Sequence, residues 1–472
     1  MLNSIIGQIN NALYSYVLII LLVVAGLWFT LRTRLVQFRL LGEQIRSITE
    51  KPKDGKGMSS FRALMVSTAS RVGTGNIIGV STALCLGGFG SVFWMWVIAL
   101  VGAASAFVEG TLAQIFKKKG EKGSYGGPAY YIEEGLGSRP LAILFAILLI
   151  VTYGVGFNML ASYNLQSTFS AYGFYESVQV GGINAMPWII GLVMAALVAY
   201  CLFGGGKRIS DMTGVLVPIM GVAYVAVSLV IVVLNAKALP SVFGRIFSEA
   251  FNLRAIFGGF GGSCVIYGIK RGLFSNEAGV GSAPNAAASA EVAHPVNQGL
   301  VQVLSVFIDT ILICSATAFM CMCSGIEPSA ELSGAPYVQA ALSETLGVVG
   351  PIFITVAMVL FAFTTLLGNL YYVEQCMAYI FGGEPPRWAR YGGYVFFSLL
   401  IFVGAGLSAG LLWDIADVTM GLMALINIPV IVILGPFAYR ALRDYEKQRK
   451  NGTSPSFRAK DVGLEDKTDY WN

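Results

Sequence analysis

The sequence predicts an all-α polytopic membrane protein with about 11 transmembrane helices, and three observations lead to this fold class. Charged residues make up only 12% of the 472-residue chain, about half the share in an average soluble domain. The mean hydropathy is +0.69, and the apolar residues gather in runs of about 20 or more, long enough to cross about 30 Å of hydrocarbon as a helix. These runs lack the strand-like alternation that marks a membrane β-barrel.

Eleven apolar stretches follow one another along the chain, and each is expected to form a membrane helix. They cover residues 13–33, 60–88, 91–116, 140–172, 187–204, 211–235, 256–292, 298–325, 349–382, 390–412 and 415–440. The first is not expected to be a cleaved signal peptide, because residues 1–12 contain no lysine or arginine and a signal peptide begins with a basic segment. The seven cysteines lie in these stretches and are expected to be buried free thiols.

The distribution of basic residues predicts the orientation of the helices. With loops alternating between the two sides, the loops on the side of the C-terminus hold 23 Lys and Arg residues and those on the other side hold three. Cytoplasmic loops carry an excess of Lys and Arg. We therefore expect a multi-pass protein of the bacterial inner membrane with its N-terminus outside and its C-terminus in the cytoplasm.

Two of the eleven stretches are interrupted by residues that helices avoid. The second contains Arg71-Val72-Gly73-Thr74-Gly75-Asn76, and the seventh contains Gly272-Leu273-Phe274-Ser275-Asn276-Glu277-Ala278-Gly279. Glycine costs about 1 kcal/mol in a helix interior, and intramembrane charges cost several kcal/mol. Non-helical backbone at membrane depth persists where it lines a cavity or is buried in protein. Close packing through small residues is the alternative, and it explains polar interruptions less well.

The positions of the two interruptions indicate an internal repeat. With the first helix set aside as an accessory, the interrupted helices are the first and sixth of ten. Five is an odd number, so the second half enters the membrane in the opposite orientation, as in inverted-repeat transporters with a site between paired broken helices. The expected divisions are an accessory helix and basic loop (1–59), a first repeat (60–240), a second repeat (241–440) and a cytoplasmic polar tail (441–472).

Four motifs carry a resemblance to a known family. They are Ala69-Ser70-Arg71-Val72-Gly73-Thr74-Gly75-Asn76-Ile77, Phe93-Trp94-Met95-Trp96, Gly126-Gly127-Pro128-Ala129-Tyr130-Tyr131 and Gly272-Leu273-Phe274-Ser275-Asn276-Glu277-Ala278-Gly279. Through them the chain resembles the alanine or glycine:cation symporter family from about residue 15 to residue 440. The resemblance implies a LeuT-type core, uptake of alanine or glycine, and coupling to sodium or sometimes protons. Members usually have Met or Leu where this chain has Val280.

An amino-acid substrate needs partners for its carboxylate and its ammonium group. Half-helix N-termini and their free N–H groups attract anions, and glycine permits close approach to the backbone. Hydroxyl and amide side chains of the second interruption can orient the ammonium group. The expected substrate-binding residues are Thr74, Gly75, Asn76, Phe274, Ser275, Asn276 and Asn158, although core packing explains Asn158 equally well.

The coupling ion, Na⁺, needs several oxygen ligands, mostly neutral ones. The resemblance assigns this role to a hydroxyl pair on the eighth core helix and to carbonyls of the first broken helix. The expected ligands are Thr364, Thr365, Ser70 and Gly73. The alternative for the threonines is a hydrogen bond from each hydroxyl to a carbonyl of its own helix. No organic cofactor is expected.

Ionisable residues inside a membrane span are functional candidates. The expected gating or charge network consists of Arg71, Glu109, Arg271, Glu277 and Asp309. For the two arginines, a structural pairing with carboxylates is the alternative. The single histidine, His294, lies at the end of a stretch and is expected to have no functional role.

Other functional classes fit the sequence less well. An ATP-driven pump needs a nucleotide site, and the sequence contains no G-x-x-x-x-G-K-[ST] motif. A single histidine and no H-E-x-x-H motif argue against a metalloenzyme. A channel also uses broken helices, but it commonly gains its symmetry from oligomers. The expected partners are a small neutral amino acid and the lipid bilayer, with no nucleic acid and no required protein. Alanine or glycine, and sodium or protons, stay open as alternatives.

Overall fold

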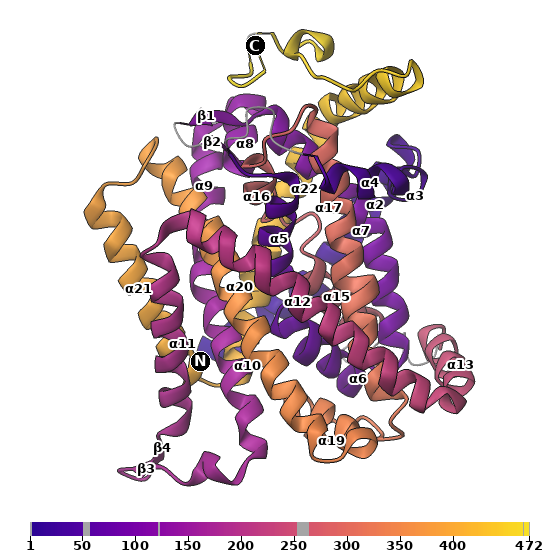
Figure 1. The fold of residues 1–472 in the computed structure, drawn as a ribbon, viewed down its shortest axis with the longest axis vertical. Coiled ribbons are helices and arrows are strands. Elements are labelled where there is room, and N and C mark those ends of the chain that lie inside the picture. Colours follow the sequence, from indigo (N-terminus) through magenta and orange to yellow (C-terminus); the bar gives the residue numbers. More distant parts are fainter. Residues whose placement is uncertain (1, 51–56, 121–122, 253–263, 466, 472) are drawn as a thin grey trace.

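Long apolar helices run side by side through the molecule, and short helices and loops gather at its two ends (Figure 1). The structure is a computed structural model that describes all residues except 1, 51–56, 121–122, 253–263, 466 and 472. Part of the seventh expected stretch, residues 256–263, lies outside the described residues. The other ten stretches each coincide with helical elements.

The helices and strands are as follows. The N-terminal part contains α1 (Leu2–Ala12), α2 (Leu18–Arg32), α3 (Val36–Arg39) and α4 (Leu41–Ile48). The first half contains α5 (Ser60–Arg71), α6 (Val80–Gly87), α7 (Gly90–Ile115), β1 (Lys118–Gly120), β2 (Gly123–Tyr125), α8 (Pro128–Leu136), α9 (Arg139–Leu149), α10 (Asn158–Thr168), β3 (Gln179–Val180), β4 (Ile183–Asn184), α11 (Met186–Leu202) and α12 (Gly205–Leu234). The second half contains α13 (Leu239–Ala250), α15 (Cys264–Asn276), α16 (Pro284–Ala288), α17 (Pro295–Val306), α18 (Ser315–Met322), α19 (Ala335–Leu346), α20 (Val349–Phe381), α21 (Arg387–Ala405) and α22 (Ala409–Lys450).

Short π-helical segments join several of these helices end to end. They are η1 (Leu13–Val17), η2 (Gly75–Gly79), η3 (Ile150–Phe157) and η7 (Phe307–Cys314). The strands form two antiparallel hairpins, β1 with β2 and β3 with β4. Such π segments occur often at functional sites. Of these four, η2 and η3 include or adjoin residues expected to bind ligands, and η7 contains Asp309 of the expected charge network.

Seven helical segments among the described residues are long and apolar enough to cross a membrane, and three shorter apolar helices accompany them. The number of membrane crossings, about 11, stays a prediction. In helix α12, only 28% of the most apolar 18-residue stretch is buried inside the protein. Its exposed side chains include Val215, Ile219, Val222 and Val233. A large exposed apolar face of this kind fits contact with lipid.

Small residues bring α7 close to the helices on both of its sides. A Cβ atom at Gly299 of α17 would lie 2.2 Å from Thr111 Oγ1, and one at Gly272 of α15 would lie 2.5 Å from an Ile98 methyl group. Helices in lipid associate through such close backbone contacts. This packing fixes the second broken helix against α7.

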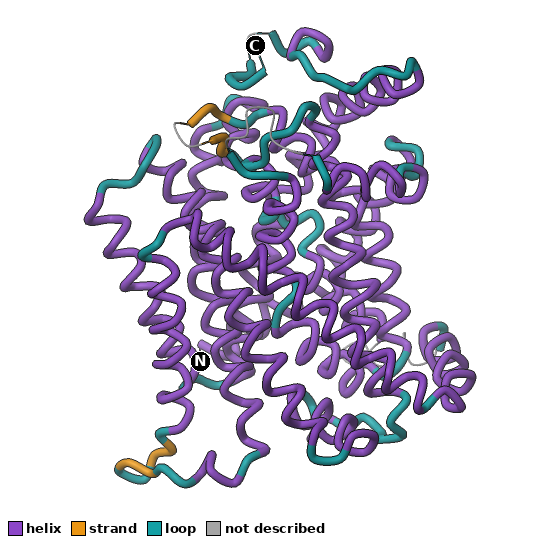
Figure 2. The backbone as a smooth tube through the Cα atoms, in the orientation of Figure 1, coloured by secondary structure: helices purple, strands orange, loops and turns teal. Residues whose placement is uncertain are grey.

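Both expected breaks are present, and they lie in the interior of the bundle, where Figure 2 shows non-helical backbone. The first helix stops at Arg71 and resumes as η2 at Gly75. The second stops at Asn276 and resumes at Pro284, and three residues between these points have positive φ: Glu277 (52°), Gly279 (88°) and Gly281 (89°). Glycine adopts positive φ at little cost, whereas a glutamate there is strained.

The C-terminal end is more ordered than a polar tail suggests. Helix α22 continues through residue 441, the expected start of the tail, and ends at Lys450. The following residues fold back across the end of the bundle near β1 and β2 (Figure 1, yellow). Buried side chains in this segment anchor it, as described below.

Candidate binding site between the broken helices

A small cavity lies where the two broken helices meet α10 and α20. It is lined by Ser70, Arg71, Gly73, Thr74, Gly75, Phe157, Leu160, Ala161, Phe274, Glu277 and Thr365. The cavity has a free volume of about 10 Å³, which is room for roughly one water molecule. The walls must therefore separate before a larger molecule fits.

The first break is held open by the Asn76 side chain. Its Oδ1 accepts a hydrogen bond from Gly73 N at 2.8 Å, and its Nδ2 donates to Asp309 Oδ1 at 2.7 Å. Asn76 thus supports the break from behind, while Thr74 and Gly75 line the cavity. A Cβ atom at Gly75 would lie only 2.7 Å from the Phe274 ring, so a larger residue here would displace that ring.

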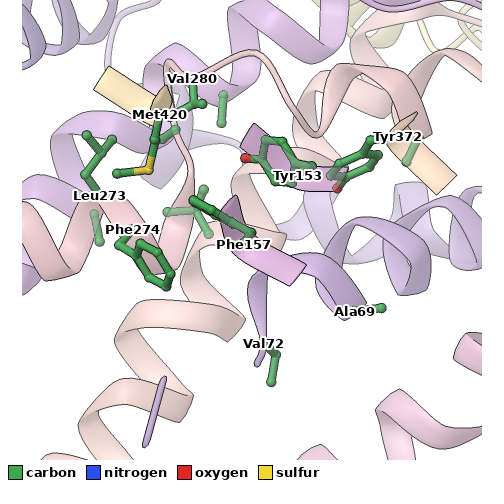
Figure 3. Close-up of a cluster of buried hydrophobic side chains, with 14 of the residues drawn as sticks. Ala69, Val72, Tyr153, Phe157, Leu273, Phe274, Val280, Tyr372 and Met420 are labelled. Carbon is green, nitrogen blue, oxygen red and sulfur yellow. The ribbon is translucent and has the colours of Figure 1, made fainter. Parts of the chain in front are cut away.

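Of the three substrate-binding residues expected at the second break, one lines the cavity, and Glu277 of the expected charge network lines it as well. Phe274 lines the cavity and its ring centroid lies 4.6 Å from that of Phe157 (Figure 3). Ser275 instead donates a hydrogen bond to Asp309 Oδ2 at 2.5 Å. Asn276 accepts one from Ala278 N at 3.0 Å.

Asn158 also lies behind the cavity wall. Its Oδ1 accepts a hydrogen bond from Asn369 Nδ2 at 3.0 Å, and Asn369 Oδ1 accepts one from Ser70 Oγ at 2.7 Å. The apolar wall on this side consists of Phe157, Leu160 and Ala161. The expected site residues include Asn158 from this helix but none of these three wall residues.

The two threonines of α20 have different surroundings. Thr365 Oγ1 is buried, lines the cavity and has no hydrogen-bond partner in the described part of the chain. A Cβ atom at Gly73 would lie 2.0 Å from it, so the hydroxyl points directly at the first break. Thr364 Oγ1 donates to Leu360 O at 2.9 Å, which is the alternative weighed for membrane threonines. The structure therefore brings Ser70, Gly73 and Thr365 together and leaves Thr364 apart.

A clamp of buried polar groups fixes the second break. Glu109 Oε2 accepts a hydrogen bond from Gly279 N at 3.2 Å. Asn427 Nδ2 lies 2.5 Å from Glu109 Oε1 and 3.1 Å from Gly279 O, and the Tyr131 hydroxyl donates to Asn427 Oδ1 at 2.5 Å. Ser282 Oγ donates to Glu277 Oε2 at 2.6 Å. Glu109 thus positions the backbone and lies outside the cavity lining.

Arg71 carries the positive charge closest to the cavity. Its side chain is buried and donates to Gln302 Oε1 at 3.3 Å, while Nε and Nη2 have no partner among the described residues. The buried carboxylates of Glu109, Glu277 and Asp309 have hydroxyl, amide and backbone partners. The alternative for Arg71, a structural pairing with a carboxylate, is not seen in the described part of the protein, and three acidic groups share one cation.

Arg271 does form the structural pairing that was the alternative for it. Its Nη2 lies 3.2 Å from Asp417 Oδ2, and its guanidinium lies 4.0 Å from the ring centroid of Trp413. The Trp413 ring packs against Phe274 with centroids 4.9 Å apart. Since Phe274 lines the cavity, this cluster of aromatic and charged groups adjoins the cavity wall. Asp417 was missed, although a carboxylate in the last apolar stretch is itself a signal.

Comparison with known sequences gives relatives along nearly the whole chain. The amino-acid carrier protein AlsT of Bacillus subtilis is 42% identical, covering 98% of this chain and 96% of its own length. The putative sodium/proton-dependent alanine carrier YrbD of the same organism is 40% identical, covering 99% and 97%. The probable sodium/glutamine symporter GlnT of B. subtilis is 39% identical, covering 97% of this chain and 93% of its own length.

The fold has a solved counterpart. The crystal structure of MhsT in complex with L-phenylalanine superposes with a TM-score of 0.54 at 14% identity, covering 88% of this chain and 93% of that one. The bundle therefore has the LeuT-type fold. The sequence profile of the sodium:alanine symporter family matches residues 1–459. With its fold, its two broken helices and this match over almost its full length, the chain belongs to the sodium:alanine symporter family.

Proposed function

We propose that this protein is a secondary active transporter that carries small neutral amino acids, alanine or glycine, into the cell together with sodium by alternating access. The observation that carries the proposal is the cavity where both breaks meet the unpartnered hydroxyl of Thr365. The protein lies in the plasma membrane with its N-terminus outside and its C-terminus in the cytoplasm.

The substrate carboxylate binds at the first break. Backbone N–H groups of Thr74 and Gly75 and the dipole of the half-helix that follows favour an anion there. The substrate side chain faces the wall made by Phe157, Ala161 and Phe274. The rings of Phe157 and Phe274 narrow this side of the cavity, which favours a small substrate side chain and supports glycine and alanine as substrates.

Sodium binds between the first break and α20. Its ligands are the Thr365 hydroxyl, the Ser70 hydroxyl and the Gly73 carbonyl, all of them oxygen groups at the cavity. Glu277 Oε1 lies 3.4 Å from Ser70 Oγ and supplies negative charge. A buried hydroxyl without a hydrogen-bond partner carries a desolvation cost. A bound cation offsets this cost because it gives the hydroxyl oxygen a partner.

Uptake measurements test this function. Purified protein in proteoliposomes should take up labelled alanine when a sodium gradient is imposed inward, and uptake should saturate with alanine concentration. Uptake that follows a proton gradient and ignores sodium would replace sodium by protons as the driving ion. A flux that does not saturate would favour a channel.

Proton coupling is the second candidate, and one observation favours it. Glu109, Glu277 and Asp309 are each at most 1% exposed, and Arg71 is the one cation that the described residues place beside all three. Buried carboxylates without a cation are costly, so one of them can take up a proton. Replacing Asp309, which lies outside the cavity lining, with Asn distinguishes the candidates, since loss of proton-driven but not sodium-driven uptake would support proton coupling.

A further inference from the structure

The C-terminal segment, residues 453–465 and 467–471, is packed against the protein. We call this segment the C-terminal strap. Its sequence is mostly polar, yet a set of its side chains is buried: Phe457, Ala459, Val462, Leu464 and Thr468. Val462 and Leu464 are only 1% exposed. A disordered tail would leave such side chains in water, so the strap has a defined docking site.

Backbone and side-chain hydrogen bonds join the strap to two parts of the helix bundle. They run from Phe457 N to Ala293 O (3.1 Å), from Lys119 N to Asp469 Oδ2 (2.8 Å), from Trp471 Nε1 to Gln114 O (2.7 Å), and from the Tyr470 hydroxyl to Glu291. One part is the end of α7 with the following hairpin. The other is the segment that follows α16.

An aromatic pair of the strap covers a buried lysine. Lys117 Nζ lies 3.8 Å from the ring centroid of Tyr470 and 5.2 Å from that of Trp471. The same amine donates to Ala290 O at 2.9 Å, and its side chain is fully buried. The strap therefore contacts the bundle through a cation–π arrangement as well as hydrogen bonds.

The surface beneath the strap is the end of both broken helices on this side of the membrane. Residues 289–293 directly follow α16, the second half of the second broken helix. Glu291 N donates to Met58 O at 2.9 Å, just before the first broken helix begins. Gln114 Nε2 donates to Ala287 O and Ala290 O at 2.5 and 2.8 Å. Both broken helices and α7 thus meet under the strap.

We propose that the C-terminal strap is a latch that holds the C-terminal side of the transporter closed and limits how fast the site opens toward that side. An opening that moves residues 289–293 away from the end of α7 must break the strap's contacts, because the strap bonds to both. The proposal rests on the alternating access of the proposed function and adds a device that regulates it.

Accessibility of Ser289 tests the latch directly. Ser289 lies at the end of α16, is 5% exposed and accepts a hydrogen bond from the Tyr371 hydroxyl at 2.8 Å. With Ser289→Cys as reporter in lipid nanodiscs, Trp471→Ala should raise the rate of thiol labelling several-fold. Lys467→Ala, an exposed strap residue, is the matched control and should leave the rate unchanged. The same protein without the reporter corrects for the native cysteines.

A reversible cross-link tests the converse. Cysteines at positions 119 and 469 (Lys119→Cys with Asp469→Cys) should form a disulfide on oxidation. The disulfide should slow alanine uptake several-fold, and reduction should restore the original rate. In either single variant, the oxidant should leave the rate of alanine uptake unchanged. A labelling rate equal to the parent's in Trp471→Ala, or normal uptake by the cross-linked protein, would overturn the latch. Absence of alanine uptake in the unaltered protein would refute the proposed function, whereas labelling would still report on the strap.

Discussion

Adjacent threonines of α20 provide a matched pair for locating sodium. Thr365 Oγ1 faces the first break and has no hydrogen-bond partner among the residues that the structure describes, whereas Thr364 Oγ1 donates to its own helix. Thr365→Ala should raise the sodium concentration for half-maximal uptake at least several-fold, because it removes an oxygen ligand. Thr364→Ala should change it little. Sodium titration of alanine uptake measures both, and equal effects of the two variants would contradict the assignment.

Gly75 controls access of the substrate carboxylate to the backbone. Gly75→Val should abolish alanine binding, because even a Cβ atom there would lie 2.7 Å from the Phe274 ring. Thr74→Ser keeps the backbone and should retain much of the binding. Competition binding on purified protein measures both variants, and it should also show alaninamide, which lacks the carboxylate charge, competing poorly. Strong competition by alaninamide would exclude a carboxylate site at this break.

Lys117 predicts how docking of the strap depends on pH. Burial lowers the pKa of Lys117 from 10.5 to about 7, although Glu291 at 3.8 Å and Glu50 oppose the shift. Release of the strap exposes the amine and raises its pKa again. The docked state thus binds fewer protons, so docking strengthens as the pH rises from about 7 toward 10.

Hydrogen exchange of the strap measures this dependence. After correction for intrinsic exchange rates, amides of residues 457–464 should be better protected at pH 9 than at pH 7. Lys117→Met removes the titrating amine and should abolish the difference. Greater protection at pH 7 would show that the attraction of the charged amine to Tyr470 and Glu291 outweighs its desolvation.

Residue identities predicted the positions of the two breaks better than the direction of each side chain. Glycines and polar residues inside apolar stretches correctly located both breaks, because few other environments tolerate them. Asn76 and Ser275 nevertheless bond to Asp309, and Phe157 joins the cavity wall. Which neighbour a side chain meets depends on how separate helices pack, and spacing along one helix does not contain that information.

At the scale of elements, the clamp on the second break predicts a measurable stability. Asn427 bonds to both Glu109 and the backbone of Gly279. Asn427→Ala leaves a buried carboxylate partly unpaired and should cost roughly 2 kcal/mol, seen as a lower unfolding temperature in detergent. Tyr131→Phe removes only the outermost hydrogen bond and should cost less. Equal unfolding temperatures for Asn427→Ala and the parent would show that the clamp adds no stability.

Hydrophobic runs predicted the helices well, since each expected stretch within the described residues coincides with helical elements. Features inside and beyond the runs were not predictable in the same way. The π segments η3 and η7 keep an apolar composition, so the sequence gives no signal for them. Helix α22 extends to Lys450 because a polar helix can continue past the bilayer, where hydropathy falls but helical propensity does not.

For the whole molecule, the loop charges predict which face meets the cytoplasm. Cysteines introduced at Ser333, before α19, and at Lys119, in β1, lie on opposite faces of the bundle. A membrane-impermeant thiol reagent should label the Ser333→Cys protein in intact cells and spare the Lys119→Cys protein. Labelling of Lys119→Cys alone would reverse the orientation.

Residues near both ends of this chain make contacts with the helix bundle. A fusion partner attached at either end can therefore disturb these contacts. Near the N-terminus, Asn10 bonds to Asp414 at 2.6 Å and accepts from Lys270 at 3.0 Å. Near the C-terminus, Trp471 bonds to the backbone of Gln114. The turn between β3 and β4 is different, because Gly181 and Gly182 are exposed with open space around them. An epitope or fluorescent domain inserted in that turn leaves both ends of the transporter in place.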